Sequence, residues 1–176
     1  MLETLISSKT RIKLLLKFFL NSNTTAYLRG LETEFGEYSN GIRLELNRFE
    51  EAGMLISSVK GNKKWFQANI KHPLFTEIHN IILKYVGIDK IIEEVIERLG
   101  DVKCVYLIGD FAKGLDSNII DLLFVGEVDK SYLINLVEKV ESLITRKIRY
   151  IIYSESEFSA INYSETINKP LLLWSR

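Results

Sequence analysis

One carboxylate in this sequence lies where a carboxylate is unexpected. Asp121 interrupts an apolar run over residues 119–125, and such a run is typical of a strand covered on both faces. An earlier apolar run, 104–108, ends at Gly109, and Gly114 follows shortly after it. Because charged groups are rarely buried without a partner, Asp121 needs a functional reason, and carboxylate oxygens bind hard cations. The pattern predicts a strand, a turn bounded by glycines, and a second strand carrying one acidic group.

The same stretch, residues 103–126, resembles the signature of the nucleotidyltransferase superfamily that includes DNA polymerase beta. In that family a Gly-Ser turn holds the triphosphate, and alternating carboxylates on the next strand, with a third on a later strand, hold two magnesium ions. The resemblance implies a small α/β domain with a mixed sheet. The residues that it implies for nucleotide binding are Gly109, Asp110, Lys113, Gly114 and Asp121.

The chemical positions of that signature are mostly changed. Asp110 stands at the serine position, Ile119 at the first carboxylate, and Arg149 at the third. One carboxylate cannot coordinate two divalent cations, and an acid at Asp110 would repel a triphosphate. We therefore expect a degenerate active site, with no catalytic residue, no bound metal and no cofactor. A simpler interpretation is that Gly109 and Gly114 only mark a tight turn.

An active enzyme is the alternative. A metal-dependent nucleotidyltransferase acting on a small molecule or a protein would need Asp110, Asp116 and Asp121 to build an unusual magnesium site.

The composition is that of a soluble globular protein. Of 176 residues, 47% are apolar and 26% are charged, and no apolar run approaches the length that spans a bilayer. Cys104 is the only cysteine, which excludes an internal disulfide, and no signal-peptide pattern is present, so a cytoplasmic location is expected. Residues 1–72 hold 11 Lys and Arg against 7 Asp and Glu, whereas the remainder holds 12 against 16. This asymmetry favours a basic module followed by an acidic one.

The basic part predicts three helices and a hairpin. Apolar spacing predicts a helix over 4–20. Its buried face is expected to hold Leu5, Ile12, Leu15, Leu16 and Phe19, and its exposed face Lys9, Lys13 and Lys17. The turn residues 21–25 are expected to cap a short helix that ends at Gly36. Ser39 is expected to cap a third helix, with Ile42, Leu46 and Phe49 buried, that ends at Gly53; strands 55–59 and 65–70 then flank a basic tip.

This outline is that of a winged helix-turn-helix. Residues 39–55 resemble the recognition helix and helix-to-wing turn of arsenical-repressor-like bacterial regulators, and residues 61–75 look like regulators of that kind fused to a nucleotidyltransferase-like domain. The fold class expected is α+β. The expected domains are a winged helix-turn-helix over 1–72, a helical connector over 73–100, and a nucleotidyltransferase-like domain over 101–176.

Double-stranded DNA is the partner that the first domain implies. A recognition helix reads base edges in the major groove, and wing lysines contact phosphates. The expected contact residues are Ser39, Asn40, Arg43, Arg48, Lys60, Lys63 and Lys64. The competing interpretation is that these are solvated charges, and Glu45, Glu50 and Glu51 on the same helix would oppose a phosphate backbone. A third interpretation is an interaction module that binds neither DNA nor nucleotide.

The connector suggests a homodimer. Apolar residues cover much of a helix that opens after Pro73, is interrupted at Gly87 and continues through Val95 and Ile96 to Gly100. A dimer interface and packing beneath the second domain explain this pattern equally well. The sequence thus predicts a DNA-binding transcriptional regulator whose degenerate second domain senses a nucleotide, dimerises or binds a partner protein.

Overall fold

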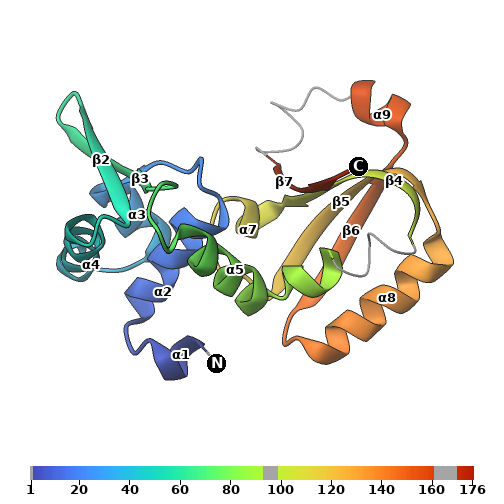
Figure 1. The fold of residues 1–176 in the computed structure, drawn as a ribbon, viewed down its shortest axis with the longest axis horizontal. Coiled ribbons are helices and arrows are strands. Elements are labelled where there is room, and N and C mark those ends of the chain that lie inside the picture. Colours follow the sequence, from blue (N-terminus) through green and yellow to red (C-terminus); the bar gives the residue numbers. More distant parts are fainter. Residues whose placement is uncertain (1, 93–98, 161–169) are drawn as a thin grey trace. The chain divides into compact units, whose positions relative to one another are not determined.

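The chain forms an α+β protein that separates into two compact units, Met1–Tyr85 and Val86–Arg176 (Figure 1). The computed structural model describes residues 2–92, 99–160 and 170–176. The α+β class expected from the sequence is therefore confirmed, with one three-stranded antiparallel sheet and one four-stranded mixed sheet. No helix among the described residues is long and apolar enough to cross a membrane.

The first unit combines helices with a small antiparallel sheet of strand order β1-β3-β2. Its elements in chain order are α1 (Leu2–Leu5), α2 (Lys9–Leu15), the π-helical turn η1 (Leu16–Leu20), β1 (Ala26–Tyr27), α3 (Leu28–Phe35), α4 (Ser39–Glu51), β2 (Leu55–Lys60), β3 (Lys63–Ala68) and α5 (Phe75–Val86).

The N-terminal segment departs from the single helix expected over 4–20. Ser8 interrupts it and caps α2, its hydroxyl accepting a hydrogen bond from the Arg11 backbone N–H at 3.2 Å. The segment then ends in the wider π-helical turn η1, which changes the phase of the buried face. Leu5, before the interruption, is 78% exposed, and Lys17, inside the π-helical turn, is buried, the reverse of the prediction for both residues. The other residues of the predicted buried face are buried: Ile12, Leu15, Leu16 and Phe19.

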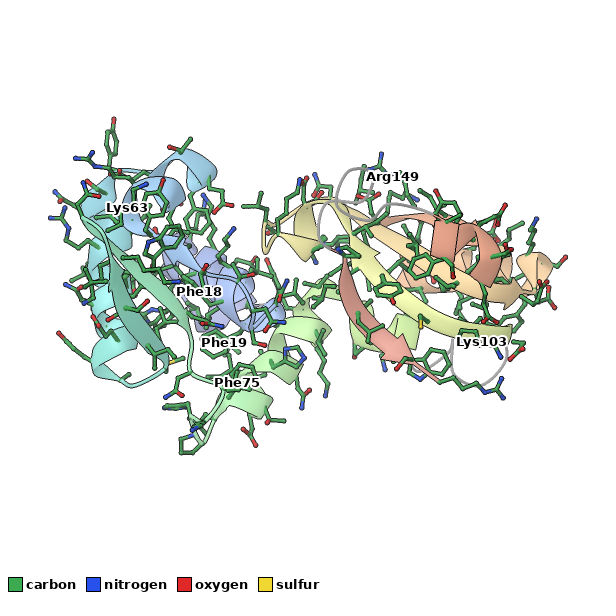
Figure 2. The ribbon with its side chains drawn as sticks, turned by 90° about the horizontal axis from the view of Figure 1, so that it is seen from above. Phe18, Phe19, Lys63, Phe75, Lys103 and Arg149 are labelled. Carbon is green, nitrogen blue, oxygen red and sulfur yellow. The ribbon has the colours of Figure 1, made fainter. Side chains whose placement is uncertain are left out.

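Phenylalanines of the π-helical turn form part of the first unit's core. Phe18 and Phe19 are fully buried among the helices (Figure 2). The ring of Phe19 lies 5.7 Å from that of Phe75, at the start of α5. His79, one turn further along α5, lies 2.6 Å from the Phe19 carbonyl oxygen through Nδ1. These contacts join α5 to the N-terminal helices.

Helix α4 keeps its predicted buried face, but neither α3 nor α4 has its predicted cap. The predicted buried residues of α4, Ile42, Leu46 and Phe49, are in the core. The positions that precede α3 and α4 are Tyr27 and Tyr38, and neither side chain makes a capping hydrogen bond. The capping predictions were wrong because β1 separates the 21–25 turn from α3, and because Ser39 is already the first helical residue of α4.

The predicted hairpin is present with a tighter tip. Strands β2 and β3 pair until Lys60 faces Lys63, which leaves Gly61 and Asn62 as the turn. Gly61 has φ +61°, a left-handed conformation that glycine adopts without strain. The basic tip expected over residues 60–64 is therefore mostly strand.

The connector begins as predicted, with α5 ending before Gly87. This glycine has φ +95°, and a Cβ there would lie 2.7 Å from Cγ2 of Ile144, so no other residue fits without movement. On α5, Ile82 is buried and Ile81 is 47% exposed. The predicted continuation through Val95 and Ile96 lies outside the described residues.

The second unit is a mixed sheet of strand order β6-β5-β4-β7, in which β5 and β6 are parallel and the other pairs antiparallel. Strand β7 forms the sheet edge beside β4. The elements are β4 (Gly100–Ile108), α7 (Gly109–Ala112), β5 (Ile119–Val128), α8 (Lys130–Leu143), β6 (Lys147–Tyr153), α9 (Glu155–Ala160) and β7 (Leu171–Ser175).

Helix α8 contributes one buried face to the core of this unit. Asp129 caps it, accepting a hydrogen bond from the Tyr132 backbone N–H at 3.0 Å. Leu133, Leu136 and Val140 recur at helical spacing on one face, and all three are buried. The central strand β5 is buried along most of its length, and Asp121 is the residue that breaks its apolar run.

Candidate functional site

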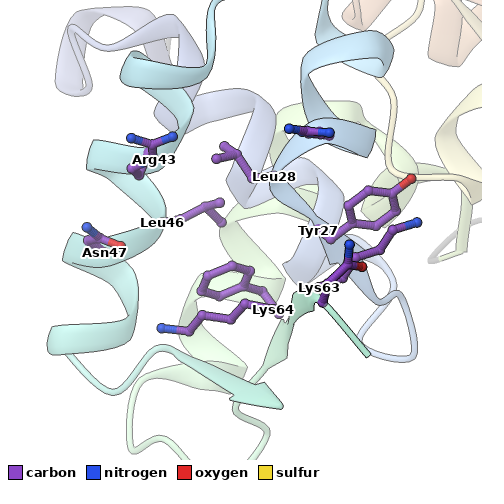
Figure 3. A pocket seen from close by; sticks show the side chains of 10 residues that line it. Tyr27, Leu28, Arg43, Leu46, Asn47, Lys63 and Lys64 are labelled. Atoms are coloured by element: carbon purple, nitrogen blue, oxygen red, sulfur yellow. The ribbon is translucent and has the colours of Figure 1, made fainter. Parts of the chain in front are cut away.

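Helix α4 presents a polar face opposite its buried one. Arg43 and Asn47 are exposed one turn apart, whereas Ile42 and Leu46 point into the core. Side chains four residues apart on a helix are neighbours, so Arg43 and Asn47 form one surface. Figure 3 shows both on α4, with Leu46 of the same helix extending toward Leu28.

A groove of about 430 Å³ lies between α4, the end of β1 and the hairpin strand β3. Its base includes the apolar side chains of Leu46 and Phe66, and its polar residues bring four positive charges together (Figure 3). We call this surface the cationic groove. Its polar side chains include Arg29, Arg43, Asn47, Asn62, Lys63 and Lys64.

The two groove lysines have different surroundings. The Lys63 ammonium lies 4.2 Å from the centre of the Tyr27 ring, a cation–π contact. The Lys64 ammonium lies 2.6 Å from Glu50 Oε2 and 5.2 Å from the centre of the Phe66 ring. Hydrogen bonds from Lys64 and Ser57 lower the pKa of Glu50, so this carboxylate stays ionised and offsets part of the Lys64 charge.

The structure brings together only some of the predicted DNA-contacting residues. Arg43, Lys63 and Lys64 line the cationic groove, whereas Ser39, Asn40 and Lys60 do not line it. Sequence reasoning missed Arg29, Asn47 and Asn62. Asn47 could have been found from the sequence, because it lies four residues after Arg43 and therefore beside it on the helix. Arg29 follows β1 and reaches the groove because β1 pairs with β3, which the sequence pattern did not reveal.

Arg48, the remaining predicted residue, lies on a different side of α4. Its Nη1 donates to Glu45 Oε1 at 3.1 Å, and Glu45 also accepts from Arg11 Nε at 2.8 Å. Glu45 is only 5% exposed. Burial would raise the pKa of Glu45, but its hydrogen bonds and attraction to Arg11, with a smaller effect of Arg48, lower it overall. The Glu45 charge is thus neutralised inside the unit and does not face the groove.

In the second unit, Asp121 and Arg149 form an ion pair across neighbouring parallel strands. The two residues are register partners of β5 and β6, and Arg149 Nε donates to Asp121 Oδ1 at 2.6 Å. Gly109 makes room for the carboxylate, because a Cβ at that position would lie 2.5 Å from Asp121 Oδ2. Its φ of +71° also favours glycine. A cavity of about 430 Å³ adjoins these three residues.

The Asp121–Arg149 ion pair sets the charge balance of this cavity. The hydrogen bond between Arg149 and Asp121, and the attraction between their charges, raise the pKa of Arg149, and Asp110 adds a smaller effect. Arg149 is largely exposed, at the surface of the second unit (Figure 2), while the Asp121 side chain is only 16% exposed. A carboxylate held this way has one oxygen committed to a guanidinium.

Only two of the five residues predicted for nucleotide binding line this cavity. Gly109 and Asp121 line the cavity, whereas Asp110, Lys113 and Gly114 do not. Within the described residues, no group of three or more His, Cys, Asp and Glu side chains could hold a metal ion. Asp116, which the alternative enzyme would require, accepts a hydrogen bond from Arg146 Nη2 at 2.9 Å.

Comparisons with known proteins do not assign this chain to a family. Neither a family model nor a curated protein matches the sequence. One solved structure, a Sulfolobus solfataricus protein provisionally described as a nucleotidyltransferase, is similar over 53% of this chain and 83% of its own, with 26% identity and a TM-score of 0.35. A TM-score of this size does not establish a common fold, so the chemistry of the second unit follows from its own side chains.

Proposed function

We propose that the first unit is a winged helix-turn-helix that binds duplex DNA, and that the protein is a transcriptional regulator. The observation that carries this proposal is the cationic groove, in which Arg43 and Asn47 of one helix face share a surface with Lys63 and Lys64 of a hairpin. Arginine and asparagine are the side chains suited to guanine and adenine edges, and lysines on a wing suit phosphates.

The element order supports this proposal. Helices α3 and α4 are followed directly by the β2–β3 hairpin, which is the order of a recognition helix and its wing. A major groove admits one helix, and the exposed face of α4 has the polar residues to read it. The acidic residues of α4 oppose this less than their number indicates, because Glu45 is neutralised by arginines and Glu50 by Lys64.

For the second unit we propose a nucleotidyltransferase-like domain without transferase chemistry. Two divalent cations need several oxygen ligands each, and Asp121 is already bound to Arg149. The alternative, an active transferase, would need Asp110, Asp116 and Asp121 to converge. It is disfavoured because Asp116 is paired with Arg146, whose side chain is 10% exposed and lies over the Phe111 ring.

A homodimer remains part of the proposal. An apolar groove of about 450 Å³ on the first unit is lined by residues of α1, α2, α4 and α5, including Leu5 and Ile81, which are exposed. Two-fold regulators match palindromic operators, so a second copy is the partner that DNA binding favours. Sedimentation of a single species with the mass of one chain at micromolar concentration would exclude this dimer.

The decisive experiment compares two cations of the first unit. Arg43→Gln removes a cation of the cationic groove, whereas Lys71→Gln removes an equal charge from an exposed side chain outside the groove. Binding to mixed-sequence duplexes, followed by fluorescence anisotropy, should weaken by roughly fivefold or more for Arg43→Gln, the cost of one good base or phosphate contact. It should stay near wild type for Lys71→Gln. Equal effects of the two changes, or no binding by the wild type, would reject the groove as the DNA site.

A further inference from the structure

Lys17 lies in the interior of the first unit, although lysine is almost never fully buried without a reason. It is 5% exposed, and its ammonium lies 2.5 Å from Glu34 Oε1 of helix α3. The π-helical turn η1 holds it there, and π turns occur frequently at functional sites. Because burying an ion pair is costly compared with apolar packing, this pair suggests a role beyond stability.

A second cavity, of about 270 Å³, opens onto this ion pair. It is separate from the cationic groove but shares Tyr27 with it. We call it the aromatic cavity. The side chains that determine its chemistry are Lys17, Tyr27, Thr33, Glu34 and Trp65.

Two aromatic rings form one part of the aromatic cavity. Tyr27 of β1 is the register partner of Trp65 on β3, and their ring centres lie 4.7 Å apart at an interplanar angle of 58°. Gly30 permits this arrangement, because a Cβ there would lie only 3.1 Å from the Tyr27 ring. Tilted aromatic faces beside a carboxylate are the groups that recognise an organic cation.

The cavity holds one charge of each sign, and Glu34 is the more accessible of the two. The side chain of Glu34 is 30% exposed, whereas that of Lys17 is 7% exposed. Lys17 binds one carboxylate oxygen of Glu34, and a carboxylate has a second. We propose that the aromatic cavity binds a small organic cation, a primary or quaternary amine, with Glu34 as its counter-ion and the rings of Tyr27 and Trp65 as its walls.

The bound cation would regulate the proposed DNA site through Tyr27. This ring belongs to both cavities, and the Lys63 ammonium of the cationic groove lies over it. A second cation at the same ring repels the Lys63 ammonium and weakens its contact with Tyr27. The lysine then loses its held position, and DNA binding weakens. This step, unlike the binding of the cation itself, rests on the proposed function.

Binding is tested with tetramethylammonium chloride as the probe, at constant ionic strength. Trp174→Phe leaves Trp65 as the single tryptophan of the chain, so its fluorescence reports the cavity. We expect saturable quenching or a spectral shift with a Kd on the order of 1 mM, as suits so small a ligand. The neutral analogue tert-butanol and the anion acetate should give no saturation. Saturation by acetate alone, or by none of the three, overturns the proposal.

Variants assign the signal to the ion pair. Glu34→Gln should weaken tetramethylammonium binding at least about tenfold. Because that change leaves Lys17 buried without its carboxylate, the double variant Lys17→Met/Glu34→Gln is tested beside it; removing both charges together avoids an unpaired ion. Glu32→Gln, on the same helix but outside the cavity, should bind as the wild type does. Unchanged binding by the folded double variant overturns the assignment.

The coupling is tested by anisotropy with a fluorescent duplex. Saturating tetramethylammonium should weaken DNA binding by the wild type about fivefold or more, and should leave the double variant unaffected beyond the general salt effect. Cation binding without any effect on a duplex that still binds would overturn the coupling alone. Failure of the wild type to bind DNA would instead reject the proposed function, while the fluorescence result would still decide the cavity.

Discussion

The neighbouring hairpin lysines, Lys63 and Lys64, should contribute unequally to DNA binding. Both line the cationic groove, but Glu50 lies 2.6 Å from the Lys64 ammonium and stays ionised. Lys63 has an aromatic ring beneath it and adds a full positive charge to the groove. Lys63→Gln should therefore remove more DNA affinity than Lys64→Gln does.

The magnitude follows from counterion release. Each phosphate neutralised by a cation contributes about 0.9 to the slope of log K against log salt concentration. Loss of the Lys63 contact should therefore lower the slope by about 0.9, which corresponds to about 3.5-fold less change in affinity between about 50 and 200 mM salt. Loss of Lys64 should lower the slope by clearly less, since Glu50 already offsets its charge. Glu50→Gln should raise affinity, because it releases Lys64 for the backbone.

The assay is anisotropy titration of one duplex over a series of salt concentrations, with Lys130→Gln as a control that removes an exposed lysine outside the groove. Wild type, Lys63→Gln, Lys64→Gln and Glu50→Gln are compared at equal temperature and pH. If Lys64→Gln flattens the salt dependence as much as Lys63→Gln, or if Glu50→Gln weakens binding, the charge assignment is refuted. If neither lysine matters, the hairpin is not part of a DNA site.

Three further predictions concern stability. Gly109→Ala should lower the free energy of unfolding in urea by about 2–3 kcal/mol, because the added Cβ brings left-handed strain and would lie 2.5 Å from Asp121 Oδ2. Gly36→Ala is the control: Gly36 has φ +63° and open space around it, so this change should show the strain alone and lower the free energy of unfolding by about 1 kcal/mol. Glu45→Gln should destabilise the first unit by about 1–2 kcal/mol, since it removes the buried partner of Arg11, and no loss in a thermal melt would refute that assignment. The pKa of Glu45 is lower in the folded state than its ordinary value of 4.5. The Glu45 carboxylate therefore stabilises the fold above pH 4.5, and this stabilisation is lost as the pH falls further. The free energy of unfolding of Glu45→Gln should accordingly depend less steeply on pH in this acid range than that of the wild type.

The sequence predicted elements well wherever apolar spacing decided them. The predicted buried face of α4 is in the core, and the apolar runs on either side of Gly109 are strands β4 and β5, as predicted. Burial produces both patterns, and the patterns are visible without coordinates. The helix expected over 4–20 was right over most of its predicted buried face and wrong at Leu5 and Lys17. Ser8 interrupts the helix after Leu5, and a π-helical turn shifts the period at Lys17, which nothing in the spacing of that lysine reveals.

The candidate site was less predictable because its charges are assigned by pairing. Arg43 and Arg48 are both exposed arginines of α4, yet only Arg43 lines the cationic groove. Their separation of five residues places them on different sides of a helix, so the sequence contained this signal. The pairing of Glu50 with Lys64 depends on how β3 folds back beside α4, and no local pattern specifies it.

The ion pair of Asp121 and Arg149 has a physical consequence for the second unit. Two carboxylates at these adjacent register positions would repel each other and would need a cation between them. An arginine at position 149 reverses the sign of that interaction, so the neighbouring strands attract each other where a second carboxylate would repel. Because Arg149 is largely exposed, the pair adds little to stability. Its main effect is on charge, since one oxygen of Asp121 is committed to the guanidinium and this register position is balanced by the two side chains themselves.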